Sequence, residues 1–133
     1  MTTFNPDSLA EMIAKSVVAD IKEFLYVQKP WGREVIISLP GTALICKYIE
    51  VNEGHRTSLQ YHREKIETIC VFEFGTGAGI ELNGKIAPLD RPCLLLPGMV
   101  HRAIGPCKFL EISSDHLDDV VRLEDDFGRE DPQ

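Results

Sequence analysis

Two short stretches of the chain hold residues that could bind a metal ion together. In Gly54–Glu67, which reads G-H-R-T-S-L-Q-Y-H-R-E-K-I-E, Gln60 and His62 are two residues apart. On an extended strand both side chains leave the same face. Glu67 follows after a short gap, and His101, preceded by P-G-M-V, offers a ligand from a distant strand. We therefore predict that Gln60, His62, Glu67 and His101 share one metal ion.

These four residues would supply one amide oxygen, one carboxylate and two imidazole nitrogens. Such a set suits a divalent transition metal (Zn, Mn, Fe, Co or Ni) rather than Mg or Ca, and it leaves coordination positions open for water or substrate. An open site indicates catalysis or ligand capture. The alternative is that His62 and His101 are isolated polar residues at strand ends, each satisfied by a backbone carbonyl.

Length and composition limit the kinds of protein that this chain can be. Its 133 residues fit one domain, and its net charge of -7 argues against a general nucleic-acid binder. No apolar run approaches the roughly 20 residues of a membrane-spanning helix, and M-T-T-F-N-P does not resemble a signal peptide. We expect a cytoplasmic protein whose four widely spaced cysteines are buried thiols.

The N-terminal 27 residues predict a helix that precedes the rest of the domain. Asn5-Pro6-Asp7-Ser8 is typical of a helix start, with an Asn cap and a Pro at the first helical position. Apolar residues then recur at steps of three and four, which predicts one apolar stripe on a helix of about five turns. The stripe consists of Leu9, Met12, Ile13, Val17, Ile21, Phe24 and Leu25. It packs on the body of the domain or, alternatively, forms the contact of a homodimer.

After Val27 the pattern changes to short runs rich in β-branched and aromatic residues, separated by Gly, Pro and Asn. The predicted strands are Arg33–Leu39, Ala43–Val51, Ser58–His62, Glu67–Phe74, Gly79–Leu82, Lys85–Pro88, Cys93–Leu96, His101–Ile104 and Lys108–Ser113. The pair Asn83-Gly84 predicts a type I′ turn, and the acidic stretch after Asp115 predicts a short helix or an irregular tail. An all-β sandwich or barrel follows from these spacings.

The same residues resemble the cupins, small double-sheet β-barrels that bind metal inside the barrel. The first cupin motif, G-x5-H-x-H-x(3–4)-E-x6-G, is followed from Gly54 to Gly75, with Gln60 in place of the first His and the closing Gly one residue late. The second, P-x-G-x-x-H, appears at 97–101 with its Pro shifted by one. The resemblance implies a cupin (double-stranded β-helix or jelly-roll) domain over residues 28–133, behind an N-terminal helical extension over 1–27.

A narrower resemblance is to type II mannose-6-phosphate isomerases. K-P-W-G-R-E at 29–34, S-L-Q-Y-H at 58–62, P-G-M-V-H-R at 97–102 and V-V-R-L-E-D-D-F-G-R at 120–129 are similar to segments of these enzymes, in the same order. This resemblance implies a metal-dependent aldose–ketose isomerase that acts on a sugar or sugar phosphate. The K-x-E pattern at 65–67 is also similar to that of D-lyxose isomerases and other sugar-handling cupins. Whether the substrate carries a phosphate group therefore stays open.

Isomerisation needs a base, and the sequence offers two candidates beside the metal strand. Lys65 stands two residues before Glu67, as a Lys or Arg does in the isomerases that the chain resembles, and a metal site could lower its pKa. Glu64 is the competing base. Arg102 is a weaker catalytic candidate because adjacent strand residues face opposite ways. Other candidates are four arginines for a phosphate and one tryptophan for stacking on a sugar, namely Arg33, Arg56, Arg63, Arg122 and Trp31.

Other functions remain open for this set of residues. Two histidines and one carboxylate also form the site of iron-dependent oxygenases, although Gln60 in the first ligand position fits that class less well. A non-catalytic sugar-binding or regulatory cupin would keep the pocket and tolerate the loss of Lys65 and Glu64. A metal-free epimerase of nucleotide sugars would leave Glu67 and His101 without an obvious role.

Overall fold

The computed structural model describes residues 24–38 and 42–132, and within these ranges the chain is all-β, as predicted. The strands are β1 (Phe24–Lys29), β2 (Gly32–Ser38), β3 (Leu44–Val51), β4 (Leu59–Tyr61), β5 (Glu67–Phe74), β6 (Gly79–Leu82), β7 (Lys85–Ala87), β8 (Cys93–Leu95), β9 (His101–Ile104), β10 (Cys107–Ser114) and β11 (Val121–Glu124). No helix within the described ranges is long and apolar enough to span a membrane. Each predicted strand has a counterpart in this set.

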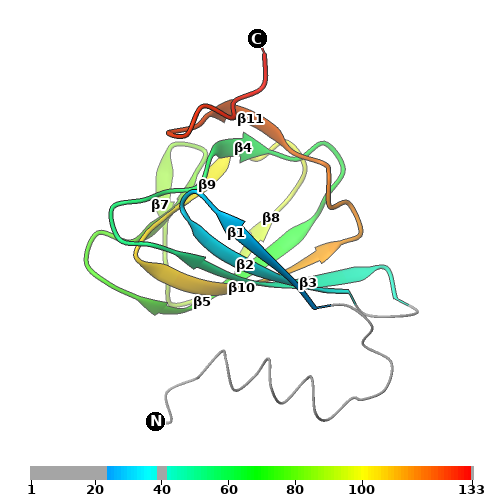
Figure 1. Cartoon of the computed structure of the whole chain (residues 1–133), viewed down its shortest axis with the longest axis horizontal. Helices are drawn as coiled ribbons and strands as arrows, with labels where there is room; N and C mark the ends of the chain where they lie inside the picture. Colours follow the sequence, from blue (N-terminus) through cyan, green and yellow to red (C-terminus); the bar gives the residue numbers. More distant parts are fainter. Residues whose placement is uncertain (1–23, 39–41, 133) are drawn as a thin grey trace.

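The strands form two sheets that face each other (Figure 1). One sheet has six strands in the order β1-β2-β3-β10-β5-β8, and the other has five in the order β11-β4-β9-β6-β7. All the named pairings are antiparallel. Strands distant in sequence are neighbours in each sheet, so residues far apart along the chain can meet in the space between the sheets.

The residues that face this interior change from apolar to polar along the strands. On β10, Cys107 and Phe109 belong to the apolar core, whereas Glu111 and Ser113 are buried polar residues further along the same face. Because side chains alternate across a strand, these four residues share the inner face. The interior is therefore an apolar core at one end and a polar cavity at the other.

Two local predictions about turns and thiols can be compared with the structure. Asn83 and Gly84 have φ angles of 48° and 80° and join β6 to β7, with Leu82 opposite Lys85. This is the two-residue hairpin that the Asn-Gly pair predicts, because both positions need positive φ. All four cysteines are free thiols, and Cys107 is buried.

The predicted N-terminal helix lies mostly outside the described residues, and with it the dimer contact that it offers. Its C-terminal end is wrong, because Phe24 to Val27 belong to β1, which pairs along its length with β2. The tight connection through Pro30 and Trp31 places these two segments side by side. Pairing with β2 supplies the backbone hydrogen bonds that a helix would otherwise have made.

The predicted helix or irregular tail after Asp115 is wrong at β11. Val121 and Arg122 pair with Tyr61 and Gln60 of β4. The backbone groups along that edge of β4 need partners, and the β-branched Val121 favours a strand there. The C-terminal segment thereby becomes part of the sheet that carries Gln60 and His101.

Candidate metal centre

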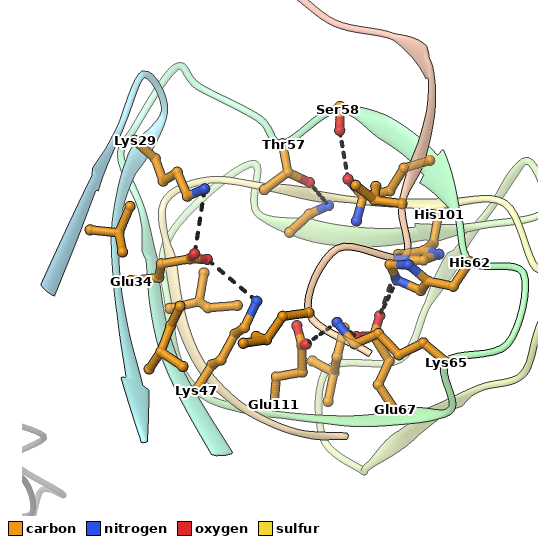
Figure 2. A pocket seen from close by; sticks show the side chains of 18 of the residues that line it. Lys29, Glu34, Lys47, Thr57, Ser58, His62, Lys65, Glu67, His101 and Glu111 are labelled. Carbon is orange, nitrogen blue, oxygen red and sulfur yellow. Dashed lines mark hydrogen bonds and ion pairs between the residues drawn. The ribbon is translucent and has the colours of Figure 1, made fainter. Parts of the chain in front are cut away.

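Three of the four predicted metal ligands meet in the interior. His62 directly follows β4, Glu67 begins β5 and His101 begins β9. Nε2 of His62 lies 3.2 Å from Glu67 Oε1, and Nε2 of His101 lies 3.1 Å from the same oxygen (Figure 2). The three side chains are buried, and their ligand atoms all lie within 4.8 Å of one another.

The other ring nitrogen of each histidine is held by the backbone. Nδ1 of His62 lies 2.5 Å from the carbonyl oxygen of Asp119, and Nδ1 of His101 lies 2.9 Å from that of Met99. A carbonyl oxygen only accepts hydrogen bonds, so each Nδ1 carries the proton that it donates. In a neutral imidazole, Nε2 then presents a lone pair to Glu67. Backbone contacts of this kind commonly orient histidines that bind a metal.

This arrangement fits a divalent metal ion. When both rings are neutral, two nitrogen lone pairs and a carboxylate oxygen converge, and a positive ion between them relieves their mutual repulsion. Glu67 Oε2 is buried and makes no hydrogen bond, although Lys65 Nζ lies 3.1 Å away. The alternative in which backbone carbonyls satisfy both histidines accounts for Nδ1 but not for Nε2. His62, Glu67 and His101 could therefore hold a metal.

Asp119 positions the segment between β4 and β5. Its carboxylate accepts backbone hydrogen bonds from Arg63, Glu64 and Lys65 at 2.9, 2.7 and 2.8 Å. Burial acts to raise the pKa of Asp119, but these three bonds outweigh it and lower the pKa to about 2. One residue thus fixes the segment that carries Lys65 and, through its own carbonyl, the ring of His62.

The fourth predicted ligand, Gln60, is close to the cluster but is differently engaged. Gln60 pairs with His101 between β4 and β9, and its Oε1 accepts a hydrogen bond of 2.6 Å from Ser58 Oγ. To bind the metal, the amide oxygen would have to exchange this bond for the ion. Gln60 also lines the cavity, together with Arg122, its partner on β11.

Lys65 lies between two carboxylates. Its Nζ is 2.8 Å from Glu111 Oε1 and 3.1 Å from Glu67 Oε2. Burial acts to lower the pKa of Lys65, but Glu111 and Glu67 outweigh it and raise the pKa. Without a bound metal, Glu67 and the second buried acid both stabilise the ammonium. The lowered pKa is expected for the metal-bound site and stays a prediction.

Glu111 is the acid that sequence reasoning missed. Burial and the charge of Glu67 raise the pKa of Glu111 to about 7, although Lys65 acts in the opposite direction. The pKa of Glu67 lies well below its usual range, since contacts with His101 and His62 and the charge of Lys65 outweigh burial. The two carboxyl groups of one pocket therefore differ in their readiness to hold a proton.

The other catalytic candidates lie away from the cluster. Glu64 is exposed and contacts His116 on the surface at 3.4 Å. Arg102 is buried, donates to the Thr57 carbonyl at 3.1 Å and does not line the cavity. Its position next to His101 on β9 explains this, because neighbouring strand residues face opposite sides.

The remaining candidates are divided between the surface and the cavity. Arg33 is paired with Glu50 on the outside, Arg56 is paired with Asp126, and Arg63 is exposed. Arg122 lines the cavity, and among the described residues no carboxylate lies within ion-pair distance of it. Trp31 is buried in the apolar core and also lines the cavity.

The cavity has a volume of about 350 Å³ and is lined by both sheets. This size is within the range of small-molecule sites. Sequence reasoning missed Glu34, Lys47 and Glu111 on its wall. Lys47 and Glu111 stand inside otherwise apolar runs, I-C-K-Y-I and F-L-E-I. A charge in register with core residues such as Ile49 was the signal that could have identified them.

Comparisons with known proteins support the fold. No family model matches the chain, and a search of curated proteins finds no relative. Among solved structures, a protein from Planctomyces limnophilus is 28% identical with a TM-score of 0.64, and the match covers 80% of this chain and 96% of that chain. Pac13 from Streptomyces, a nucleoside dehydratase, is 12% identical with a TM-score of 0.63, and the match covers 83% of this chain and 92% of Pac13.

A cupin-2 domain protein from Rhodospirillum rubrum is also similar, at 14% identity and a TM-score of 0.59, over 79% of this chain and 76% of that chain. These structures support the prediction that the described part of the chain has the cupin fold. The narrower resemblance to mannose-6-phosphate isomerases finds no counterpart among them and stays a prediction.

Proposed function

We propose that this chain is a metal-dependent enzyme that interconverts an aldose and a ketose, with a sugar or sugar phosphate as its substrate. The observation that carries the proposal is the convergence of His62 Nε2, His101 Nε2 and Glu67 Oε1 on one point of the cavity. A buried proton-carrying pair, Lys65 and Glu111, lies directly beside that point. Metal ligands next to an acid and a base are what isomerisation requires.

The residues of the chain have separate roles in this proposal. His62, Glu67 and His101 would hold the metal, with Gln60 as a fourth ligand if it leaves Ser58. A bound divalent ion would polarise the carbonyl oxygen of the sugar. Glu111 would take a proton from the carbon next to the carbonyl and return it to the carbonyl carbon, while the proton of the neighbouring hydroxyl would pass to the former carbonyl oxygen. Lys65, held between two carboxylates, would orient the sugar oxygens by donating hydrogen bonds.

Metal content gives the first test of the proposal. Purified protein should carry close to one equivalent of a divalent metal, and His62→Ala and His101→Ala should lose most of it. The chain offers matched controls in His55 and His116, which lie outside the cluster. Alanine at either control position should leave the metal content unchanged. A wild-type protein that takes up no metal under any loading condition would contradict the proposal.

Turnover gives the second test. Metal-loaded protein is incubated with mannose 6-phosphate, fructose 6-phosphate, mannose and lyxose, and aldose and ketose are separated by chromatography. Interconversion of at least one pair is expected, and Glu111→Gln should abolish it while retaining metal. Absence of interconversion with every common divalent metal, or substrate-dependent oxygen consumption with Fe(II), would reject isomerisation in favour of binding or oxygenase chemistry.

Dehydration of a sugar or nucleoside is a second candidate. The same Lys65–Glu111 pair supports it, because elimination of water needs one group to remove a proton and another to protonate the departing hydroxyl. A structure of Pac13 with uridine illustrates a small-molecule ligand in a protein of this fold. Release of an unsaturated product and water, in place of the isomeric sugar, would favour this reaction.

A further inference from the structure

A second group of buried charges lies across the cavity from the histidines. Glu34 on β2 and Lys47 on β3 are 7% and 9% exposed, and both line the cavity. Lys29, from β1, lies on the other side of Glu34 (Figure 2). These three residues come from the strands at one edge of the six-stranded sheet, whereas the metal ligands belong to β4, β5 and β9 or adjoin them.

The contacts among these three residues leave hydrogen-bonding capacity unused. Lys29 Nζ lies 3.4 Å from Glu34 Oε1, and Lys47 Nζ lies 4.0 Å from Glu34 Oε2. Within the described part of the chain, the three charged groups contact one another only through these two long ion pairs. All three groups line the cavity and can therefore form further hydrogen bonds with a ligand that enters it, and hydrogen bonds to charged groups are strong ones.

These charges continue toward the metal centre in alternating sign. Lys47 lies directly opposite Glu111 in the β3–β10 pairing, and Glu111 contacts Lys65, which contacts Glu67. The row therefore contains three lysines and three glutamates, and its net charge is zero. All six residues line the cavity, and the row extends from Lys29 to the metal ligand Glu67.

The composition of this row selects the chemical class of its ligand. A hydroxyl group both donates and accepts hydrogen bonds, so successive hydroxyls can bond to alternating ammonium and carboxylate groups. A phosphate dianion or a carboxylate only accepts, so Lys29 and Lys47 would attract it, but Glu34 between them would repel it and would receive no hydrogen bond from it. We propose that Glu34 and Lys47 form a second subsite that binds the uncharged, hydroxyl-bearing end of a polyol substrate. This inference rests on the proposed function, since the reacting end would lie at the metal centre.

Binding of a polyol that cannot isomerise tests the subsite independently of turnover. The probes are D-mannitol and its 1-phosphate, titrated calorimetrically into protein with and without Mn²⁺. Glu34→Gln and Lys47→Met should each weaken mannitol binding about tenfold to a hundredfold, as expected for loss of a hydrogen bond to a charged group. Lys29→Met, at a more exposed position, is a further variant that should fold readily and weaken binding less.

Matched controls are available in Glu73→Gln and Lys108→Met, because these residues form an ion pair of 3.2 Å outside the cavity. The controls should bind mannitol as wild type does, and all variants should keep their metal content and circular dichroism spectrum. Unchanged mannitol binding in Glu34→Gln and Lys47→Met would overturn the subsite, as would absence of mannitol binding to the wild type. A larger loss for the phosphate ester than for mannitol in Lys47→Met would also overturn it.

The same measurements separate this inference from the proposed function. Mannitol binding that depends on Glu34 and Lys47, in a protein that converts no sugar, would support the subsite and reject the isomerase. Sugar isomerisation with a KM unaffected by both substitutions would support the isomerase and reject the subsite.

Discussion

Replacing Lys65 by methionine removes the ammonium group that separates two buried carboxylates. The lysine side chain is 5% exposed and lies 2.8 Å from Glu111 and 3.1 Å from Glu67. Methionine keeps much of the length and apolar volume of the side chain but not its charge. In metal-free protein, the two glutamates would then face each other without a compensating cation.

The size of the effect follows from these contacts. Removing one partner of a buried ion pair costs about 3–5 kcal/mol, because an uncompensated charge stays in the interior. The pKa of Glu111 is already raised to about 7, so this group can take up a proton near neutral pH and limit the cost. A shift of one unit in the pKa of such a group corresponds to about 1.4 kcal/mol. We therefore expect Lys65→Met to lower the free energy of unfolding by about 3 kcal/mol at pH 7.

The assay is urea unfolding of chelator-treated protein, monitored by circular dichroism, for the wild type, Lys65→Met, Glu111→Gln and the double variant. If the lysine acts by compensating Glu111, the double variant should be more stable than the sum of the two single losses predicts, by about 1–3 kcal/mol. Lys108→Met is the control, because this lysine lies outside the cavity. A loss below about 1 kcal/mol for Lys65→Met, or additive losses in the double variant, would refute the reasoning.

Three further predictions concern positions outside the proton-carrying pair. Asp119→Ala should lower metal affinity about tenfold or more, measured by competition with a chelator, because it releases three backbone amides beside His62. Gly32→Ala should destabilise the fold by about 3 kcal/mol in urea, since a Cβ there would overlap the backbone oxygen of Glu50 on β3. Burial raises the pKa of the Cys107 thiol to about 11, so iodoacetamide should label it slowly at pH 8, and faster only as the pH approaches 11.

Each of these predictions has a control and an opposing outcome. Asp118→Ala leaves intact the three backbone hydrogen bonds that the Asp119 carboxylate accepts. Equal metal affinity in the Asp118 and Asp119 variants would contradict the role of Asp119. Gly54→Ala meets no atom within 4 Å and should cost only about 1 kcal/mol for its positive φ. Urea-unfolded protein should label at every cysteine. Rapid labelling of Cys107 in the native state at pH 8 would contradict the raised pKa of this buried thiol.

The strands and most of the metal cluster could be predicted because their signals are local. Alternation of apolar residues defines strands such as β10, and Asn83-Gly84 defines a hairpin, through steric rules that act over a few residues. His62 and Glu67 are close in sequence, and His101 joins them through a recognisable motif that resembles the cupins. The sequence also predicts Gln60 as a ligand, but its amide oxygen is bonded to Ser58, and its role at the metal stays a prediction.

The ends of the described chain could not be predicted in the same way. The apolar spacing around Phe24 and Leu25 satisfies a helix, yet these residues belong to β1. The segment at Val121 resembled a tail and yet forms β11. In both cases the partner strand decides the conformation, because a sheet edge supplies backbone hydrogen bonds that no property of the segment itself reveals.

By itself the sequence determined that the chain is all-β in its described part and that His62, Glu67 and His101 could meet around a metal. Tertiary structure alone decided what surrounds that metal site. It placed Lys65 between Glu111 and Glu67 and left Glu64 exposed to solvent. The physical reason is register: the pairing of β3, β10 and β5 places Lys47, Glu111 and Glu67 on one inner face, and burial then makes each charge depend on its neighbours.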